Sequence, residues 1–117
     1  MTVTPDRYVT YRYAGASGDF NPIHLDDEFA RSVDLPSKIL HGLWTMAQVA
    51  RAHGEAFGNP LVLKSMSVQF RGMGVPEKDI TITSKLTAQS EDEAVFECEA
   101  VQDGNKLVRR GRAVLRI

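Results

Sequence analysis

The sequence predicts an α+β fold in which an antiparallel sheet wraps around one long buried helix. The first observation is that residues 42–57 follow a helical pattern whose first half is apolar on nearly every side, which is typical of an enclosed helix. The second is that apolar and polar residues alternate with a period of two from Leu61 onward, as in strands with one buried face. Since both elements must bury apolar surface, the economical arrangement is a sheet that wraps the helix.

Four successive stretches carry this alternation, and they predict four strands of an antiparallel meander joined by turns such as Asp103-Gly104-Asn105. Cys98 shares a predicted strand face with apolar residues, so we expect a buried and unreactive thiol. The residues expected on the buried face are Met66, Val68 and Phe70, then Ile80, Ile82, Leu86 and Ala88, then Phe96, Cys98 and Ala100, and finally Leu107, Ala113, Leu115 and Ile117.

Short helices are predicted ahead of the long one. Thr4 and Pro5 are residues typical of an N-cap and a first helical position, so we expect a helix that begins there and stops at Gly15. A second helix is expected over residues 26–31, where three acidic residues stand at the start. Residues 33–40 read as a loop, the long helix ends at Gly58, and His53 near its end is expected to be an ordinary exposed residue.

Length and composition limit the possibilities further. The chain has 117 residues, which predicts one domain over residues 1–117. Its formal charge of -1 gives no electrostatic case for binding nucleic acid or an anionic membrane. We find no signal-peptide pattern and no apolar run long enough to span a bilayer, so a cytoplasmic location is expected. A single cysteine excludes an internal disulfide.

The segment Gly18-Asp19-Phe20-Asn21-Pro22-Ile23-His24 carries the clearest chemical signal. Asp19 and His24 combine a carboxylate with an imidazole, and such a pair can move protons near neutral pH. Gly18 permits a sharp turn before Asp19, and Pro22 restricts the path between the two groups. A second segment, Ile39-Leu40-His41-Gly42, stands at the start of the long helix.

Together the two segments closely resemble the MaoC-like (R)-specific hydratase/dehydratase family of hotdog-fold enzymes. The resemblance implies a hotdog fold and the (R)-specific hydration of trans-2-enoyl thioesters, or the reverse dehydration, with no cofactor. It implies that Asp19 and His24 lie on either side of one water. We assign Asp19 as the base and His24 as the partner that positions the water and returns the proton, a division that the sequence leaves open. It also implies that the Gly42 amide binds the thioester oxygen. Helix N-termini offer unpaired amides for such an oxyanion, and a residue without a β-carbon permits close approach.

The remaining candidate residues are assigned supporting roles. Asn21 is expected to tie down the loop, and His41 to orient the loop or contact the substrate. Lys38, Lys64 and Arg71 are candidates for contacts with the phosphates of a carrier, which is coenzyme A or acyl carrier protein. No metal is expected, because the acidic residues 26–28 lack His or Cys ligands at regular spacing. Two other functions stay open: a hotdog thioesterase, and a non-catalytic acyl-binding or structural subunit of a hetero-oligomeric dehydratase.

Two departures from the family pattern lead to further expectations. Family members carry a strand ahead of the first helix, whereas this chain begins almost directly at Thr4-Pro5, so we expect a sheet that is short by one strand. The family's Pro-Gly-Asp turn is replaced by residues 75–79. Because a small sheet cannot cover a helix that is apolar all round, an obligate dimer is expected, a homodimer by default and a heteromer with a related hotdog subunit as the alternative.

Overall fold

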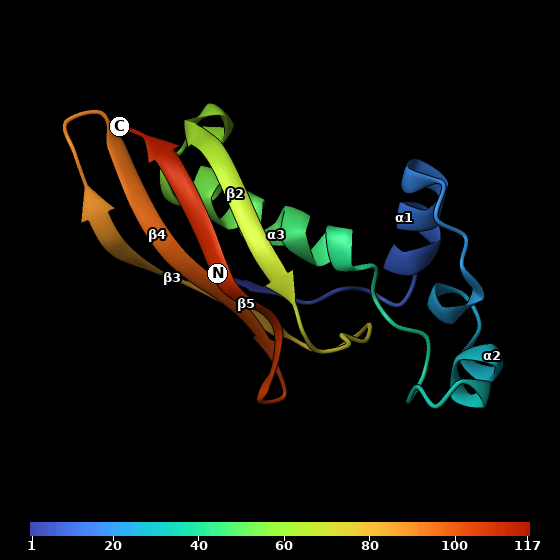
Figure 1. The fold of residues 1–117 in the computed structure, drawn as a ribbon. Helices are drawn as coiled ribbons and strands as arrows, with labels where there is room; N and C mark the ends of the chain where they lie inside the picture. Colours follow the sequence, from blue (N-terminus) through green and yellow to red (C-terminus); the bar gives the residue numbers. More distant parts are fainter.

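The computed structural model describes residues 1–117, and it contains one antiparallel sheet with a long helix against its inner face (Figure 1). This arrangement confirms the predicted α+β class. The strands are β1 (Thr2–Val3), β2 (Leu63–Phe70), β3 (Ile80–Gln89), β4 (Glu93–Gln102) and β5 (Asn105–Arg116). The helices are α1 (Val9–Ser17), α2 (Asp27–Ser32) and the long α3 (Gly42–Ala56), with short 3-10 turns η1 (Pro22–His24) and η2 (Pro60–Val62).

The strand order in the sheet differs from the predicted meander. It is β1-β3-β4-β5-β2, so β3, β4 and β5 follow one another as expected, whereas β2 pairs with β5 instead of β3. The predicted turn joins β4 to β5 through Asp103 and Gly104, whose φ angles of 50° and 76° are those of a tight hairpin. By contrast, residues 71–79 form a connection too long for a tight hairpin, and they carry the chain from the edge strand β2 across the sheet to β3, the neighbour of β1.

The N-terminal residues form a strand, and the expected four-stranded sheet is therefore wrong by one strand. Thr2 and Val3 pair with β3, which makes the sheet five-stranded. The expected helix start at Thr4 is also wrong, since α1 begins at Val9. The physical reason is that Thr4 donates its hydroxyl to Asp79 and the Pro5 carbonyl accepts the Glu77 amide, so both residues are held against the 75–79 connection.

Helix α3 starts at Gly42 as predicted, but it is not buried on all sides. Only Thr45, Val49 and His53 are buried along it, and their spacing of four places them on one stripe that faces the sheet. Leu43 is 60% exposed, because within one chain the sheet covers a single face of the helix. The uncovered residues are apolar in the first half of the helix, at Leu43 and Ala47, and charged in the second half, at Arg51 and Glu55.

Two buried polar groups lie where α3 meets the sheet. His53 was expected to be exposed, yet it is 3% exposed, with its ring nitrogens 2.8 Å from the Val49 carbonyl and the Ser84 hydroxyl. These two partners satisfy both nitrogens, which is why an imidazole is tolerated in this position. Cys98 is buried as expected, and burial raises the pKa of its thiol, so the unreactive neutral form is favoured.

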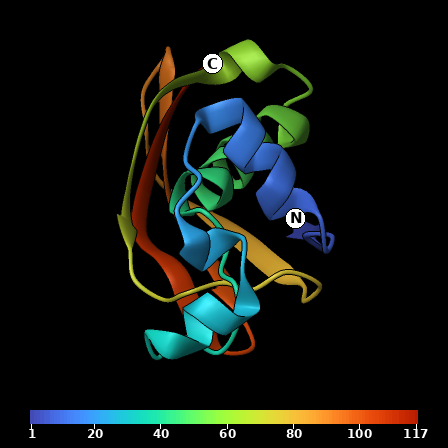
Figure 2. The ribbon, with the colours of Figure 1, turned by 90° about the vertical axis from the view of Figure 1, so that its right-hand side faces the viewer.

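The molecule is extended because α1 and α2 lie beyond the N-terminal end of α3 (Figures 1 and 2). Its dimensions are 52 × 27 × 19 Å and its radius of gyration is 15.1 Å. A compact domain of this length has a radius of gyration of about 13 Å, so this chain has an open shape. Its helices are all too short or too polar to cross a bilayer.

Candidate active site

The loop that carries Asp19 is held by hydrogen bonds between neighbouring residues. Helix α1 ends at Ser17, two residues later than expected, and Gly18 closes it in the left-handed conformation at φ 78°. The Asp19 carboxylate then accepts the Asn21 amide at 3.2 Å, and the Asn21 side chain accepts the Ile23 amide at 3.2 Å to start η1. The side chains of Asp19 and Asn21 therefore hold the chain from Asp19 to His24 in one defined conformation.

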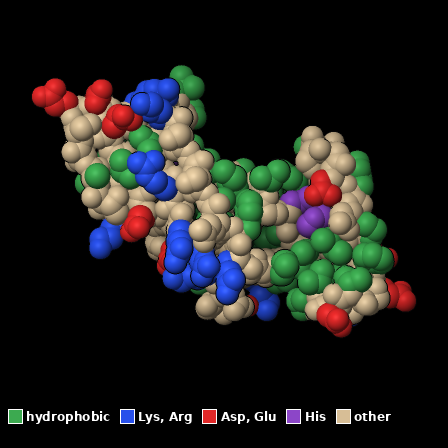
Figure 3. Space-filling model, viewed as in Figure 1, with side chains coloured by type: hydrophobic (Ala, Val, Ile, Leu, Met, Phe, Trp, Pro, Cys, Tyr) green, Lys and Arg blue, Asp and Glu red, His purple; other side chains and the backbone are tan.

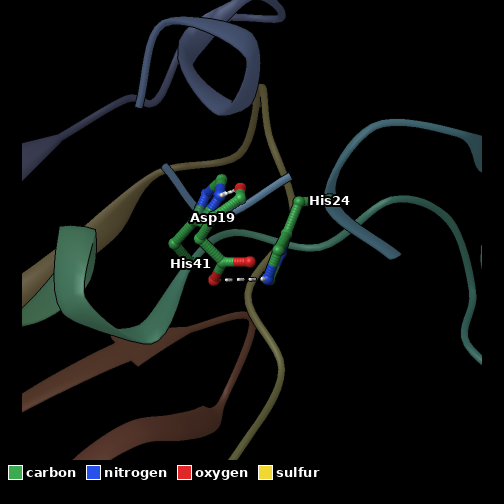
Figure 4. Close-up of side chains that lie close together, drawn as sticks. All are labelled: Asp19, His24 and His41. Carbon is green, nitrogen blue, oxygen red and sulfur yellow. Dashed lines mark hydrogen bonds and ion pairs between the residues drawn. The ribbon is translucent and has the colours of Figure 1, made fainter. Parts of the chain in front are cut away.

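His24 is buried in η1, and its environment selects which ring nitrogen faces the site. Its Nδ1 lies 2.8 Å from the Ile39 carbonyl, which can only accept, so Nδ1 carries the proton. Its Nε2 lies 3.6 Å from the Asp19 Oδ2 (Figure 4). That separation is longer than a direct hydrogen bond and leaves both atoms able to contact one small molecule such as water. The Asp19 side chain is 52% exposed, so the pair opens to solvent on the carboxylate side.

His41 joins this pair from the start of α3. Its ring stacks on the His24 ring with centroids 3.8 Å apart and an interplanar angle of 20°. Its Nε2 donates to the Asp19 backbone carbonyl at 3.0 Å (Figure 4), and the centroid of the tilted Tyr13 ring of α1 lies 4.9 Å from that of the His41 ring. His41 therefore holds the Asp19 loop, the His24 ring and the first turn of α3 in one unit.

The three side chains lie close enough to raise the question of a metal. One potential ligand atom from each of Asp19, His24 and His41 falls within 4.8 Å of the others. However, an imidazole binds a metal through a lone pair in the plane of its ring, and the two rings are nearly parallel. Their in-plane lone pairs cannot converge on one ion as a tetrahedral site requires. The geometry suits proton transfer better than a three-ligand metal site.

The N-terminus of α3 supplies free backbone donors beside the pair. The amides of Trp44 and Thr45 both bond to the His41 carbonyl, whereas those of Gly42 and Leu43 have no acceptor in the chain. They are directed outward at the positive end of the helix dipole, where an oxyanion is stabilised. Gly42 also has a packing role, because a β-carbon there would lie 3.2 Å from the Phe70 ring. The close contact with the Phe70 ring is therefore one reason why position 42 carries a glycine.

The three basic candidates are not brought together. Lys38 precedes the His41 segment and is held there by Asp27, with its Nζ 3.8 Å from the carboxylate. Lys64 pairs with Glu93 at 3.0 Å, and it stands six positions before Phe70 along β2, a distance of about 20 Å. Arg71 directly follows Phe70 and is exposed without an ion-pair partner. Among the three, Arg71 alone is both free and next to the proposed oxyanion donors.

The Asp27–Lys38 contact makes the stability of this region pH-dependent. Asp27 accepts the Lys38 backbone amide at 2.8 Å, and this bond, with the charges of Lys38 and Arg31, lowers the pKa of the Asp27 carboxyl below 3.8. A lowered pKa stabilises the folded protein above about pH 4, and this contribution is lost as the pH falls through the lower folded value. We expect Asp27→Asn to reduce the melting temperature at pH 7, with a gap from wild type that narrows below pH 4. A gap of equal size at pH 7 and pH 2.5 would contradict this explanation.

The site lies at the surface of a hollow between the sheet and the α1–α2 region, with the histidine side chains facing it (Figure 3). Large apolar side chains around it are exposed, among them Phe20 at 60%, Leu43 at 60% and Phe70 at 51%. A carboxylate and an imidazole beside free helix amides and an apolar surface are features of one class of enzymes, those that carry out acid–base chemistry on a substrate with an apolar chain and an oxygen that develops negative charge.

Comparison with known proteins agrees with this class. The family model described as "MaoC like domain" matches residues 1–109. The chain therefore belongs to the MaoC-like family, whose named relatives include hydratases and dehydratases, and its fold is the hotdog fold expected from the sequence.

Two curated relatives illustrate the match. The "Fatty acid synthase subunit beta" of Aspergillus oryzae is 37% identical over 105 residues, which cover 86% of this chain and 5% of that protein. The "Probable enoyl-CoA hydratase 2" of Dictyostelium discoideum is 31% identical over 117 residues, 98% of this chain and 38% of that protein. The chain thus spans less than two thirds of these relatives. The solved (R)-hydratase of A. caviae has a TM-score of 0.89 at 23% identity, covering 100% of this chain and 91% of that one, which shows the shared fold.

Some features of the site were missed by sequence reasoning. The Leu43 amide is as free as that of Gly42, a consequence of helix geometry that could have been inferred from the helix start. The stacking of His41 on His24 and the contact of Phe70 with Gly42 join residues distant in the sequence, and no local pattern signals either contact.

Proposed function

We propose that this protein catalyses the (R)-specific hydration of trans-2-enoyl thioesters, or the reverse dehydration of (R)-3-hydroxyacyl thioesters. The observation that carries the proposal is the pair of Asp19 Oδ2 and His24 Nε2, 3.6 Å apart, beside the free amides that begin α3. The name of the Dictyostelium relative, an enoyl-CoA hydratase, supports this substrate class, and the name of the A. caviae protein, an (R)-hydratase, supports the stereochemistry.

In the proposed reaction one water binds between the two side chains. Its oxygen forms a bond to C3 of the substrate as one of its O–H bonds breaks, and Asp19 accepts the released proton. We assign His24 Nε2 as the atom that positions the water and gives a proton to C2, because Nδ1 is committed to the Ile39 carbonyl. The step therefore starts with protons on both ring nitrogens of His24 and with Asp19 ionised. The proton that Asp19 takes from the water then passes to Nε2, so the pair ends with the protons that it had at the start.

The electrons displaced from the double bond collect on the thioester oxygen. In our proposal the Gly42 and Leu43 amides bind this enolate oxygen, and the dipole of α3 adds to their effect. His41 connects the proton-transfer pair with the oxyanion donors, since it packs on His24 and immediately precedes Gly42. Its proposed role is to fix the positions of these two groups relative to each other.

The function is tested by adding the purified chain to crotonyl-CoA and following two signals together. Hydration removes the ultraviolet absorbance of the enoyl thioester and releases no thiol, and chiral analysis of the product should give the (R)-3-hydroxy form. Thiol release at the same rate as the absorbance loss would indicate a thioesterase. Binding of the thioester without either signal, with any partner subunit present, would indicate a non-catalytic acyl-binding subunit.

We also propose that the protein acts as a dimer that covers the apolar face of α3. The support is the 60% exposure of Leu43, the open shape of the chain and the edge strand β2, which has an unpaired side. Light scattering should give about twice the 13.0 kDa chain mass. An active and stable species at the chain mass would overturn the proposal. An inactive chain that becomes active with a co-expressed related subunit would favour the heteromer over the homodimer.

A further inference from the structure

We propose that Gln102 is a positioning residue for the hydration reaction, because it anchors the 71–79 connection that holds the proton-transfer pair over the start of α3. The inference rests on the proposed hydratase function and adds a residue outside the pair and the helix amides. It is carried by the hydrogen bonds of Gln102, by the segments that the connection holds and by the close packing of Gly74.

Gln102 has a buried amide side chain whose hydrogen bonds all go to the connection. It ends β4 beside the hairpin turn and is 4% exposed. Its Oε1 accepts the Val75 amide at 2.9 Å, and its Nε2 donates to the Val75 carbonyl at 2.8 Å and to the Lys78 carbonyl at 2.9 Å. One side chain thus satisfies three backbone groups that lie outside the strands. These bonds attach the connection to the hairpin between β4 and β5.

The connection in turn holds the two chain segments that flank the α1–α2 region. Before α1, the Pro5 carbonyl accepts the Glu77 amide at 2.6 Å, and Glu77 adopts φ 71°, a left-handed conformation that a residue with a β-carbon keeps only when its contacts impose it. After α2, the Leu40 amide donates to the Gly74 carbonyl at 2.8 Å. Figure 1 shows the connection running from the end of β2 toward the segment that leads into α3. Both ends of the region that carries the pair are therefore attached to the sheet through the connection.

Leu40 stands between the residue that holds His24 and the free amides that begin α3. The preceding Ile39 carbonyl lies 2.8 Å from the His24 Nδ1, and Gly42 follows two residues after Leu40. Helix α3 packs on the sheet, whereas the pair belongs to the region beyond the N-terminal end of this helix. The bond from Leu40 to Gly74 therefore helps to fix the position of the pair relative to the oxyanion donors.

Gly74 shows how closely the connection approaches this segment. It is buried, and a β-carbon added there would lie 2.8 Å from a side-chain carbon of Leu107 and 3.0 Å from one of Leu40. Both leucines belong to the hydrophobic core, so neither can move aside without disturbing its neighbours. The close approach therefore requires a glycine, and Gly74→Ala should displace Leu40 while the bonds of Gln102 stay in place.

The test measures kcat and KM for crotonyl-CoA with Gln102→Leu, which nearly keeps the size of the side chain and removes all three bonds. A misplaced oxyanion donor weakens transition-state binding more than substrate binding, so kcat should fall about 10- to 100-fold while KM changes less than about twofold. Gly74→Ala should give a smaller loss of the same kind, and it decides the question if Gln102→Leu does not fold. Assays well below the melting temperature of each variant keep the folded fraction constant.

Ser84→Ala is the matched control, because it removes another buried side-chain bond, the one to His53 at 2.8 Å in the second half of α3. It should lower the melting temperature and leave kcat unchanged. Amide hydrogen exchange gives a readout that does not depend on activity. The Leu40 amide should exchange about tenfold faster in Gln102→Leu than in the wild type and should stay slow in Ser84→Ala.

Combining Gln102→Leu with Gly42→Val separates positioning from a general loss of stability. Because both changes act on the same oxyanion donors, the double variant should lose much less kcat than the product of the single losses. Unchanged kcat in folded Gln102→Leu and Gly74→Ala, or an equal loss in Ser84→Ala, would overturn the positioning role while the hydratase function stands. A wild type that hydrates no enoyl thioester would overturn the proposed function, and this inference with it.

Discussion

Replacing Asp19 by Asn is expected to lower kcat for enoyl-thioester hydration by about 10²–10⁴-fold, the usual contribution of a general acid or base. The side chain is half-exposed, and Asn keeps an oxygen that can accept the Asn21 amide, so the loop and the melting temperature should be nearly unchanged. KM should change far less than kcat. Steady-state kinetics on crotonyl-CoA measure both values.

The role of His24 can be tested with a substitution that keeps its hydrogen bond to the Ile39 carbonyl. His24→Asn retains an amide donor near the position of Nδ1 for the Ile39 carbonyl and removes Nε2, so it should lose activity on the same scale with less structural damage than a larger change. The double variant Asp19→Asn with His24→Asn should be little worse than either single one, because the two groups act on one water as a unit. Multiplicative losses would mean that they act independently, and full activity of Asp19→Asn would refute the mechanism.

Replacing Gly42 by Val is expected to lower kcat by about 10²–10³-fold, the cost of losing one oxyanion donor. The valine side chain would meet the Phe70 ring, since even a β-carbon lies 3.2 Å from it, and it would stand beside the amide that binds the thioester oxygen. The expected loss is in kcat, with a smaller fall in melting temperature from the crowded contact. Both are measured on one preparation.

The two reasons for a glycine at this position can be separated with Phe70→Ala. Combined with Gly42→Val, it removes the ring that the new side chain would meet, so the melting temperature should recover. Activity should not recover if the valine obstructs the thioester oxygen. Recovery of both would show that Gly42 serves packing alone, and a fully active Gly42→Val protein would place the oxyanion donors elsewhere.

The parts of the fold that local patterns specify were predictable from the sequence. The period of two from Leu61 onward located the long strands, and Asp103-Gly104 located the hairpin between β4 and β5. The pairing of β2 with β5 was not predictable, because alternation fixes which face a strand buries and not which strand lies beside it. The strand at Thr2–Val3 was missed because two residues carry no period, and its pairing depends on β3.

For the site, the sequence predicted which residues carry chemistry better than how they meet. The Asp19 loop is specified locally, since the side chains of Asp19 and Asn21 bond to amides two residues ahead. The position of His24 depends on the distant Ile39 carbonyl, and that of His41 on the Asp19 carbonyl. Burial of His53 was missed for the same reason, since its partner Ser84 lies on β3. Such long-range contacts are set by tertiary packing.

The measurement that tests the central claim most directly is the stereochemistry of hydration in D₂O. If one water between Asp19 and His24 supplies the hydroxyl to C3 and the pair supplies the proton to C2, both groups arrive from the same side of the double bond. Hydration of crotonyl-CoA should then give the (R)-3-hydroxy product with deuterium at C2 added syn to the hydroxyl. Anti addition, or a product with random configuration at C2, would contradict a single water held between these two side chains.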